Sequence, residues 1–334
     1  MQQYSSLTLP WPVNWRTLFG RQRPLILEIG FGRGAFLMHL ADQNPDANII
    51  GLEINNRCLV AAERAIRRRQ LRNLIVIHSR AETALHHLFE PDSLQAIYIN
   101  FPDPWFKKDH HHRRLMQRDT IDALVSRLQP GGRLYLATDI LEYAEMSADL
   151  LKATPGLDNL LPGRWSETPL PGRVITKYEA KARAEGRTCT YFAWQRNDQP
   201  APDVPVIWEI PMPHIVFQSP VTLDDIQERF TPFQQNDGRT YAHVMNVYRG
   251  RHTLLFEIHL HEPTIEQHTA LLLTERKPKP GQPQEYTLQM STLGHPRPTE
   301  GMHYVVGLIG DWLLSLHPDA KRIISKVSAV EADS

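Results

Sequence analysis

Runs of apolar residues alternate with amphipathic stretches along the first half of the chain. Five short apolar runs predict strands, at residues 25–29, 48–53, 74–78, 95–100 and 133–138. Between them, apolar residues recur at helical spacing over residues 35–43 and 57–70. Strands that alternate with helices are typical of a parallel sheet covered by helices. We therefore predict a doubly wound α/β domain.

The second half of the chain has a different pattern. Residues 174–184 predict a last helix of the first domain and residues 189–195 a late strand, and the polar, proline-rich residues 197–205 predict a linker. Beyond the linker, strand-like alternation and one helical run follow, at residues 253–261, 270–275, 285–290 and 305–317. We therefore predict a first domain over residues 1–196 and a smaller α+β domain over residues 206–334.

The composition and the N-terminal sequence indicate where in the cell we expect the protein. Lys plus Arg equals Asp plus Glu at 37 each, and no apolar run approaches the roughly 20 residues that a membrane span needs. The N-terminal residues lack the pattern of a secretory signal, and the two cysteines, Cys58 and Cys189, are too few for a disulfide framework. We expect a cytoplasmic protein with no membrane partner, and the composition leaves its oligomeric state open.

Basic residues cluster in two places, residues 64–72 and 107–118. Such clusters can bind phosphates on a protein whose net charge is zero, but they are also common on solvated helix faces. Charge alone does not choose between the two interpretations.

A glycine-rich loop follows the first predicted strand, with Gly30, Gly32 and Gly34 directly after Glu28. Glycine lets the backbone approach a bound nucleotide closely, and Glu53, at the end of the second strand, can accept hydrogen bonds from ribose hydroxyls. Together these residues predict a nucleoside cofactor. The alternative is a set of turn glycines beside a solvated glutamate.

The spacing of the loop and its acid favour S-adenosylmethionine over NAD. The glycines follow Gly-x-Gly-x-Gly, whereas the dinucleotide fingerprint is Gly-x-Gly-x-x-Gly. A carboxylate at Glu28 would repel a pyrophosphate, but it suits a ligand that carries a sulfonium and an ammonium.

The fourth predicted strand runs into the sequence NFPDPWFKKDHHHRRL, residues 100–115. Its prolines predict a stiff loop in which Phe101 and Trp105 offer stacking surfaces to a purine, and Asp103 can accept hydrogen bonds from guanine. The alternative is a proline-braced turn with a packed Trp. Adjacent histidines point in different directions, so we expect residues 110–112 to form a solvated run and predict no metal site.

These motifs together resemble the bacterial tRNA (guanine-N7-)-methyltransferases. The resemblance covers roughly residues 15–196 and rests on EIGFGRG, GLEI, NFPDPWFKKDHHHRRL, Ala-Thr-Asp at 137–139 and Thr-Lys-Tyr-Glu at 176–179, in family order. It implies a Rossmann-like S-adenosylmethionine-dependent methyltransferase domain over residues 1–196. The implied reaction moves a methyl group to N7 of a guanine, position 46 in the variable loop of tRNA.

The resemblance also assigns residues. It implies that Glu28, Glu53 and the glycines of the loop hold S-adenosylmethionine, and that Asp103 contacts both cofactor and guanine as the catalytic residue. It implies RNA contacts at Lys107, Asp139, Thr176, Lys177, Tyr178 and Glu179. The chain departs at Arg80, which stands where the family usually has an Asp or Asn near the adenine, and there Ser79, Glu82 or backbone amides can substitute.

The chemistry of the nucleophile sets what the enzyme must do. N7 of guanine has a free lone pair and no proton, so its methylation needs no general base and depends mainly on positioning. Asp103 or Asp139 would stabilise the cationic product, and Lys107, Lys108, Arg113 and Arg114 would contact phosphates. Thr176 is also expected to cap a helix that receives the RNA at its N-terminus.

Two other interpretations stay open at this point. One is a catalytically inactive RNA-binding relative, which Arg80 favours, and the other is a different nucleotide-dependent enzyme on the same fold. The second domain lies outside the resemblance and receives no role. Its His259 and His261 share one strand face, which we interpret as an exposed face and not a metal site.

Overall fold

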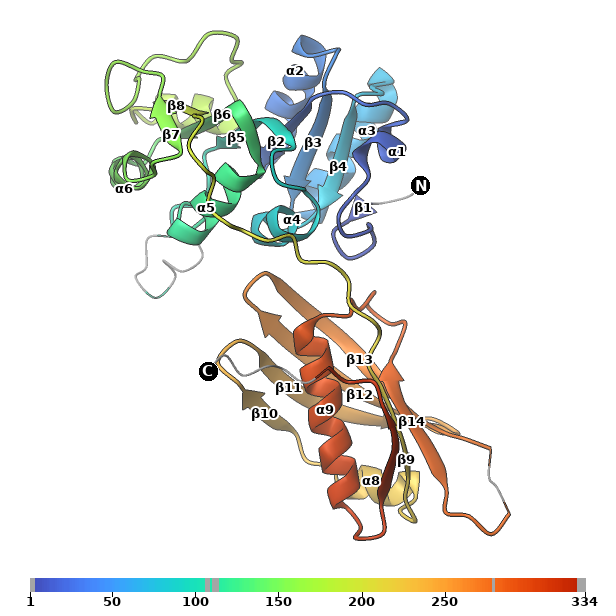
Figure 1. Ribbon diagram of the computed structural model, residues 1–334. Coiled ribbons are helices and arrows are strands. Elements are labelled where there is room, and N and C mark those ends of the chain that lie inside the picture. Colours follow the sequence, from blue (N-terminus) through green and yellow to red (C-terminus); the bar gives the residue numbers. More distant parts are fainter. Residues whose placement is uncertain (1–3, 106–108, 110–113, 278–279, 329–334) are drawn as a thin grey trace. The chain divides into compact units, whose positions relative to one another are not determined.

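The computed structural model describes residues 4–105, 109, 114–277 and 280–328 (Figure 1). The chain divides into two compact units, Met1–Trp208 and Glu209–Ser334. Residues just before the division are attached to the first unit, because Arg127 donates hydrogen bonds to the carbonyl oxygens of Val204 and Pro205. The end of the predicted linker therefore lies against the first unit.

The first unit is built on one sheet, whose strand order among the described residues is β1-β4-β3-β2-β5-β6-β8-β7. Neighbours from β1 to β6 pair in parallel, and β8 is antiparallel to both β6 and β7. The strands are β1 (Tyr4–Ser5), β2 (Leu25–Ile29), β3 (Asn48–Glu53), β4 (Leu74–His78), β5 (Leu94–Asn100), β6 (Leu128–Thr138), β7 (Leu157–Asn159) and β8 (Thr190–Arg196).

Helices connect these strands: α1 (Trp15–Phe19), α2 (Ala35–Gln43), α3 (Asn56–Arg69), α4 (Ala81–His87), α5 (Arg118–Arg127), α6 (Leu141–Lys152) and α7 (Lys177–Ala184). The apolar runs of the central strands bury both faces of the sheet. Ile26 and Ile49 face the core formed with α2 and α3, while Leu27 and Ile50 point to the other face and are equally buried. The predicted doubly wound α/β architecture is thus confirmed.

The strand order places a topological switch between β2 and β5. From β2 the chain moves outward through β3 to β4, then returns to β5 on the opposite side of β2 and continues to β6. The helices that follow β2 and β5 therefore leave the sheet in opposite directions. In such sheets the crevice outside the carboxyl ends of the two strands is the usual ligand site.

The second unit is an antiparallel sheet of order β10-β11-β12-β13-β14-β9-β15, packed against one long helix. Burial alternates along β12, which is the pattern of a sheet with one face on a core. Its elements are β9 (His214–Gln218), α8 (Leu223–Arg229), β10 (Phe233–Asn236), β11 (Tyr241–Arg249), β12 (Thr253–Glu262), β13 (Ile265–Glu275), β14 (Glu285–Met290), α9 (Glu300–Ser315) and β15 (Lys321–Ser325). This is the predicted α+β composition.

Helix α9 begins earlier than its apolar run suggested. Thr299 caps it by accepting a hydrogen bond from the Met302 amide, and the buried Glu262 accepts one from the Gly301 amide. The side chain that fixes the start of the helix therefore comes partly from β12. No helix in the described part of the chain is long and apolar enough to span a bilayer.

Candidate functional site

The predicted cofactor residues come together at the carboxyl ends of β2 and β3. Gly30, Gly32 and Gly34 all have positive φ, at 70°, 55° and 78°, so the loop after β2 turns through the left-handed region three times within five residues. The Gly30 amide donates to the carbonyl of Leu52 on β3. The loop is therefore tied to the neighbouring strand before α2 begins.

Glu53 closes this loop from the other side. One carboxylate oxygen accepts a hydrogen bond from the Gly32 amide at 2.8 Å, and the other accepts from the Ile54 and Asn55 amides at 2.9 and 3.0 Å. The residue predicted to bind the ribose thus also holds the glycine loop in place. Its carboxylate is half-buried and keeps lone pairs for a ligand.

Glu28 lies on β2 directly below the loop and is 1% exposed. One of its oxygens accepts a hydrogen bond from the side-chain amide of Asn100 at 3.0 Å, and the other is buried without a hydrogen-bond partner among the described residues. Burial raises the pKa of Glu28 to about 8, against the opposing effects of Asn100 and the Arg173 cation. A cationic ligand would supply the missing partner and favour the charged carboxylate.

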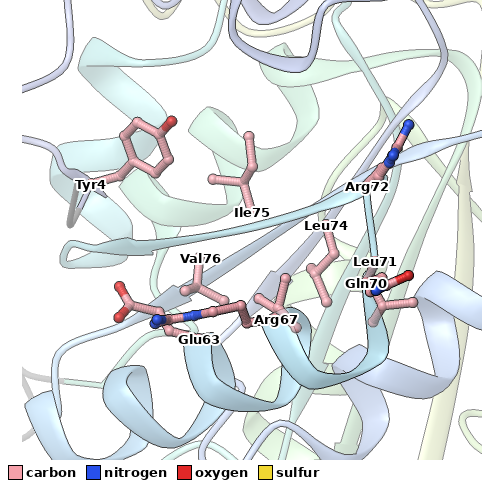
Figure 2. A pocket seen from close by; sticks show the side chains of 10 residues that line it. Tyr4, Glu63, Arg67, Gln70, Leu71, Arg72, Leu74, Ile75 and Val76 are labelled. Carbon is pink, nitrogen blue, oxygen red and sulfur yellow. The ribbon is translucent and has the colours of Figure 1, made fainter. Parts of the chain in front are cut away.

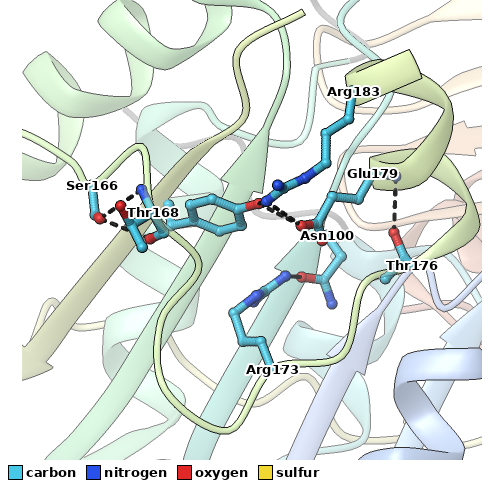
Figure 3. Close-up of polar contacts among 8 residues, drawn as sticks. Asn100, Ser166, Thr168, Arg173, Thr176, Glu179 and Arg183 are labelled. Carbon is cyan, nitrogen blue, oxygen red and sulfur yellow. Dashed lines mark hydrogen bonds and ion pairs between the residues drawn. The ribbon is translucent and has the colours of Figure 1, made fainter.

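Arg173 joins this group from a distant part of the sequence. Its guanidinium donates to the side-chain oxygen of Asn100 at 2.6 Å and lies over the rings of Phe36 and Tyr191, at 4.9 and 5.3 Å from their centroids. Figure 3 shows Arg173 beside Asn100. Neither residue was predicted to belong to the site, because 73 positions separate them and no local motif marks the pair.

The aromatic loop after β5 leaves the sheet in an unusual conformation. Phe101 and Trp105 have positive φ, at 51° and 43°, which is uncommon outside glycine and costs energy that the surrounding structure must offset. Asp103 between them is exposed. The loop therefore presents its carboxylate to solvent at the same edge of the sheet as Glu28.

Arg114 is buried against this loop, so the prediction that it contacts phosphate is wrong. It is 6% exposed, donates to the carbonyl of Pro104 at 2.8 Å and pairs with Glu142 at 3.1 Å. Because its side chain is buried and its guanidinium is hydrogen-bonded on both sides, Arg114 stabilises the loop. The predicted RNA contact Lys107, the further cations Lys108 and Arg113, and the histidines at 110–112 lie outside the described residues.

The segment predicted to contact RNA begins α7. Thr176 caps the helix by accepting from the Glu179 amide at 3.1 Å, as predicted. Lys177 and Tyr178 are exposed, whereas Glu179 is 1% exposed and accepts hydrogen bonds from Tyr191 at 2.6 Å and Arg183 at 2.9 Å. Figure 3 shows Thr176, Glu179 and Arg183 in this arrangement. Glu179 therefore anchors the helix that presents Lys177 and Tyr178.

Two further predicted residues follow neighbouring strands. Asp139 comes after β6 and forms an ion pair with Arg187. Arg80 comes after β4, where the Ser79 amide bonds to the carbonyl of Glu53, and its guanidinium lies 3.7 Å from the carboxylate of Glu82. Both positions lie at the carboxyl edge of the sheet, and the roles predicted for them stay predictions.

A groove of about 540 Å³ lies elsewhere on the first unit and contains none of these residues (Figure 2). It runs along β4 at residues 74–76 and is flanked by Tyr4, Arg67 and Arg72. Among the described residues, strand β1 pairs with β4 at Ile77 and His78, next to this groove. Within the described ranges, no three His, Cys, Asp or Glu side chains converge as a metal site would require.

Comparison with known proteins relates the chain to methyltransferases. The model of a family described as "Putative methyltransferase" matches residues 22–192. One similar relative is the tRNA (guanine-N(7)-)-methyltransferase of Paraburkholderia xenovorans, which is 39% identical over 52% of this chain and 65% of that protein. The tRNA (guanine-N(7)-)-methyltransferase of Mycobacterium avium is also 39% identical, over 56% of this chain and 71% of that protein. The chain thus spans about two thirds of the length of its curated relatives.

The solved structures that resemble the chain include two further methyltransferases. The aminoglycoside resistance methyltransferase NpmB1 is 18% identical, with a TM-score of 0.40 over 58% of this chain and 95% of that one. The 16S rRNA methyltransferase KamB is 13% identical, with a TM-score of 0.40 over 59% of this chain and 100% of that one.

Proposed function

Since this chain belongs to the methyltransferase family whose model spans residues 22–192, we propose that it methylates N7 of a guanine in tRNA, with S-adenosylmethionine as the methyl donor. One observation carries the proposal. Glu28, the glycine loop, Glu53 and the loop of Asp103 all lie at the carboxyl edge of one sheet, beside its topological switch. The guanine that we propose is the one at position 46, in the variable loop.

The residues at this edge fit such a cofactor. Glu28 has a buried oxygen that no described residue hydrogen-bonds, which suits a cationic group, and Glu53 lies where an adenosine ribose binds in sheets of this kind. The glycine backbone leaves room for close approach, and Arg80 or its neighbours would border the adenine. When bound, the cofactor supplies an electrophilic methyl group on a sulfonium.

Asp103 is the residue that we propose to act on the guanine. Its carboxylate is exposed on the loop after β5, where it can accept hydrogen bonds from guanine N1 and N2 and stabilise the positive charge that methylation leaves on the base. Trp105 and Phe101 flank it and offer stacking surfaces. No proton has to leave N7, so positioning and charge carry the catalysis.

Contacts with the rest of the RNA follow from the same edge. Lys177 and Tyr178 are exposed at the start of α7, where helix N-terminal amides attract phosphate. We also propose RNA contacts for Lys107, Asp139, Thr176 and Glu179, on the family resemblance. A tRNA substrate is consistent with the cytoplasm as the working compartment.

The test is transfer of labelled methyl from S-adenosylmethionine to unmodified tRNA, with the labelled base mapped by N7-specific chain cleavage. The full chain is compared with Asp103→Ala and with Asp46→Ala, a control that removes an exposed carboxylate in the turn before β3. We expect label at the variable-loop guanine with the wild type and the control, and none with Asp103→Ala.

Each other outcome favours one of the remaining interpretations. If the wild type binds S-adenosylhomocysteine and tRNA but transfers no label, the chain is an inactive RNA-binding relative. If NAD and not S-adenosylhomocysteine raises its melting temperature, it is a different nucleotide-dependent enzyme.

A further inference from the structure

Arg173 is held against α2 by the segment that leads into α7. His39, on α2, donates a hydrogen bond to the carbonyl oxygen of Gly172 at 2.7 Å, and Phe36 lies beneath the Arg173 guanidinium. Val174, the next residue, packs on the core formed by α2 and α3. These contacts fix the guanidinium beside the first turn of α2, next to the glycine loop.

Asn100 connects this cation to the buried acid of the site. Its side-chain oxygen accepts from Arg173 at 2.6 Å and its amide donates to Glu28 at 3.0 Å. Glu28, Asn100 and Arg173 thus form a hydrogen-bonded bridge with a charged side chain at each end. Two buried atoms of these charged side chains, Arg173 Nε and Glu28 Oε2, have no hydrogen-bond partner among the described residues. Buried polar atoms are usually paired, so two unpaired atoms of opposite charge on one bridge point to a ligand.

We propose that Arg173 and Glu28 together bind the amino-acid end of the cofactor, with the guanidinium receiving its α-carboxylate and Glu28 its α-ammonium. The inference rests on the proposed function, since it takes S-adenosylmethionine as the ligand. Asn100 keeps the two receptors at a fixed separation. An α-amino acid carries the complementary pair of charges, so both ends of the bridge are satisfied at once.

The electrostatics of the site agree with a carboxylate at Arg173. Burial lowers the pKa of this guanidinium, and Glu179, Tyr191 and Glu28 offset that effect only in part. A ligand carboxylate beside Arg173 would favour the charged guanidinium and so oppose the effect of burial on its pKa. The competing receptor is the set of backbone amides in the glycine loop at the N-terminus of α2, which can also bind a carboxylate.

The test measures how much the carboxylate of the ligand contributes to binding. Calorimetric titration of the full chain compares S-adenosylhomocysteine with its decarboxylated analogue, which keeps the adenosine and the ammonium. The variants are Arg173→Gln, Arg173→Lys and the control Arg164→Gln, which removes another arginine of the first unit that lies over an aromatic ring, at 5.3 Å from the Trp165 centroid, and pairs with Asp149.

We expect the wild type and Arg164→Gln to prefer S-adenosylhomocysteine over the analogue by about 10- to 100-fold, the range for a hydrogen bond to a charged group. Arg173→Gln should lose this preference while binding the analogue as the wild type does, and Arg173→Lys should keep part of it. Matching thermal unfolding of the variants establishes that they are folded.

Three outcomes would overturn the inference. Equal weakening of both ligands by Arg173→Gln would mean that Arg173 acts only through Asn100. An unchanged preference in both Arg173 variants would assign the carboxylate to the loop amides. A wild type that binds neither ligand would refute the proposed function itself, which the first two outcomes leave intact.

Discussion

The ring of Tyr178 lies directly over the position that a side chain at Gly32 would occupy. A Cβ built on Gly32 comes within 3.4 Å of Tyr178 Cε2, so the first turn of α7 closes over the glycine loop that follows β2. The loop predicted to hold the cofactor and the helix predicted to meet the RNA therefore lie next to each other.

Gly32→Ala should weaken binding of S-adenosylhomocysteine. Alanine at a φ of 55° costs about 1–2 kcal/mol in backbone strain, which the loop would relieve by shifting, and its Cβ would touch Tyr178. Gly20→Ala is the matched control, because Gly20 has a φ of 69° and open space around its Cβ position. We expect both variants to lose stability in chemical unfolding, but only Gly32→Ala to lose ligand affinity, by about tenfold. Equal affinities would contradict the role of this contact.

Glu28→Gln should change how stability depends on pH. The pKa of Glu28 is about 8 in the folded protein and near 4.5 when unfolded, so between these values the folded protein holds a proton that the unfolded chain has released. The stability that the proton on Glu28 contributes is complete below pH 4.5 and is lost as pH rises towards 8, by up to about 1.4 kcal/mol per pH unit.

The measurement is urea unfolding of both proteins at several pH values in this interval. Glu28→Gln cannot titrate, so its stability should fall less steeply than that of the wild type. Glu63→Gln, a substitution on α3 away from the site, should follow the wild type. Parallel curves for wild type and Glu28→Gln would show that Glu28 keeps an ordinary pKa.

Arg114→Ala should slow methyl transfer more than it weakens cofactor binding, because Glu28, Glu53 and the glycine loop stay in place. The substitution removes the brace on Pro104, next to Asp103, and misplacement of a reacting group by about 1 Å can lower kcat by up to about a hundredfold. Arg118→Ala is the control, since it breaks a comparable ion pair, with Asp122, within α5. Steady-state kinetics and calorimetry check this expectation, which an unchanged kcat in Arg114→Ala would refute.

Gly310→Ala should destabilise the second unit. A Cβ at Gly310 would lie 2.3 Å from Cδ1 of Ile215, and because that side chain is 1% exposed and has little room to move aside, we expect a cost of about 1–3 kcal/mol. Gly307→Ala, on the same helix, would meet nothing closer than 3.6 Å and should stabilise the helix by up to about 1 kcal/mol. Thermal unfolding compares the two, and equal shifts would rule out the packing explanation.

Much of the fold was determined by local sequence patterns. The apolar runs at β2, β3 and β4 matched the observed strands residue for residue, because strands buried on both faces tolerate little polarity. Thr176 was identifiable as a helix cap, since a capping side chain acts within three residues. The family resemblance, which the family model and the curated relatives together confirm, rests on similarly compact motifs.

Tertiary structure decided what the charged residues do. Arg114 was expected to face RNA and is instead buried under a loop, and a basic residue in a basic run carries no local sign of that difference. The bridge from Glu28 through Asn100 to Arg173 joins β2, β5 and the segment before α7, which only the folded chain brings together. Local sequence determined the strands, the caps and the motif loops, because those depend on near neighbours. Burial and long-range pairing set the state of each ionisable group, because desolvation and partners exist only in the packed protein.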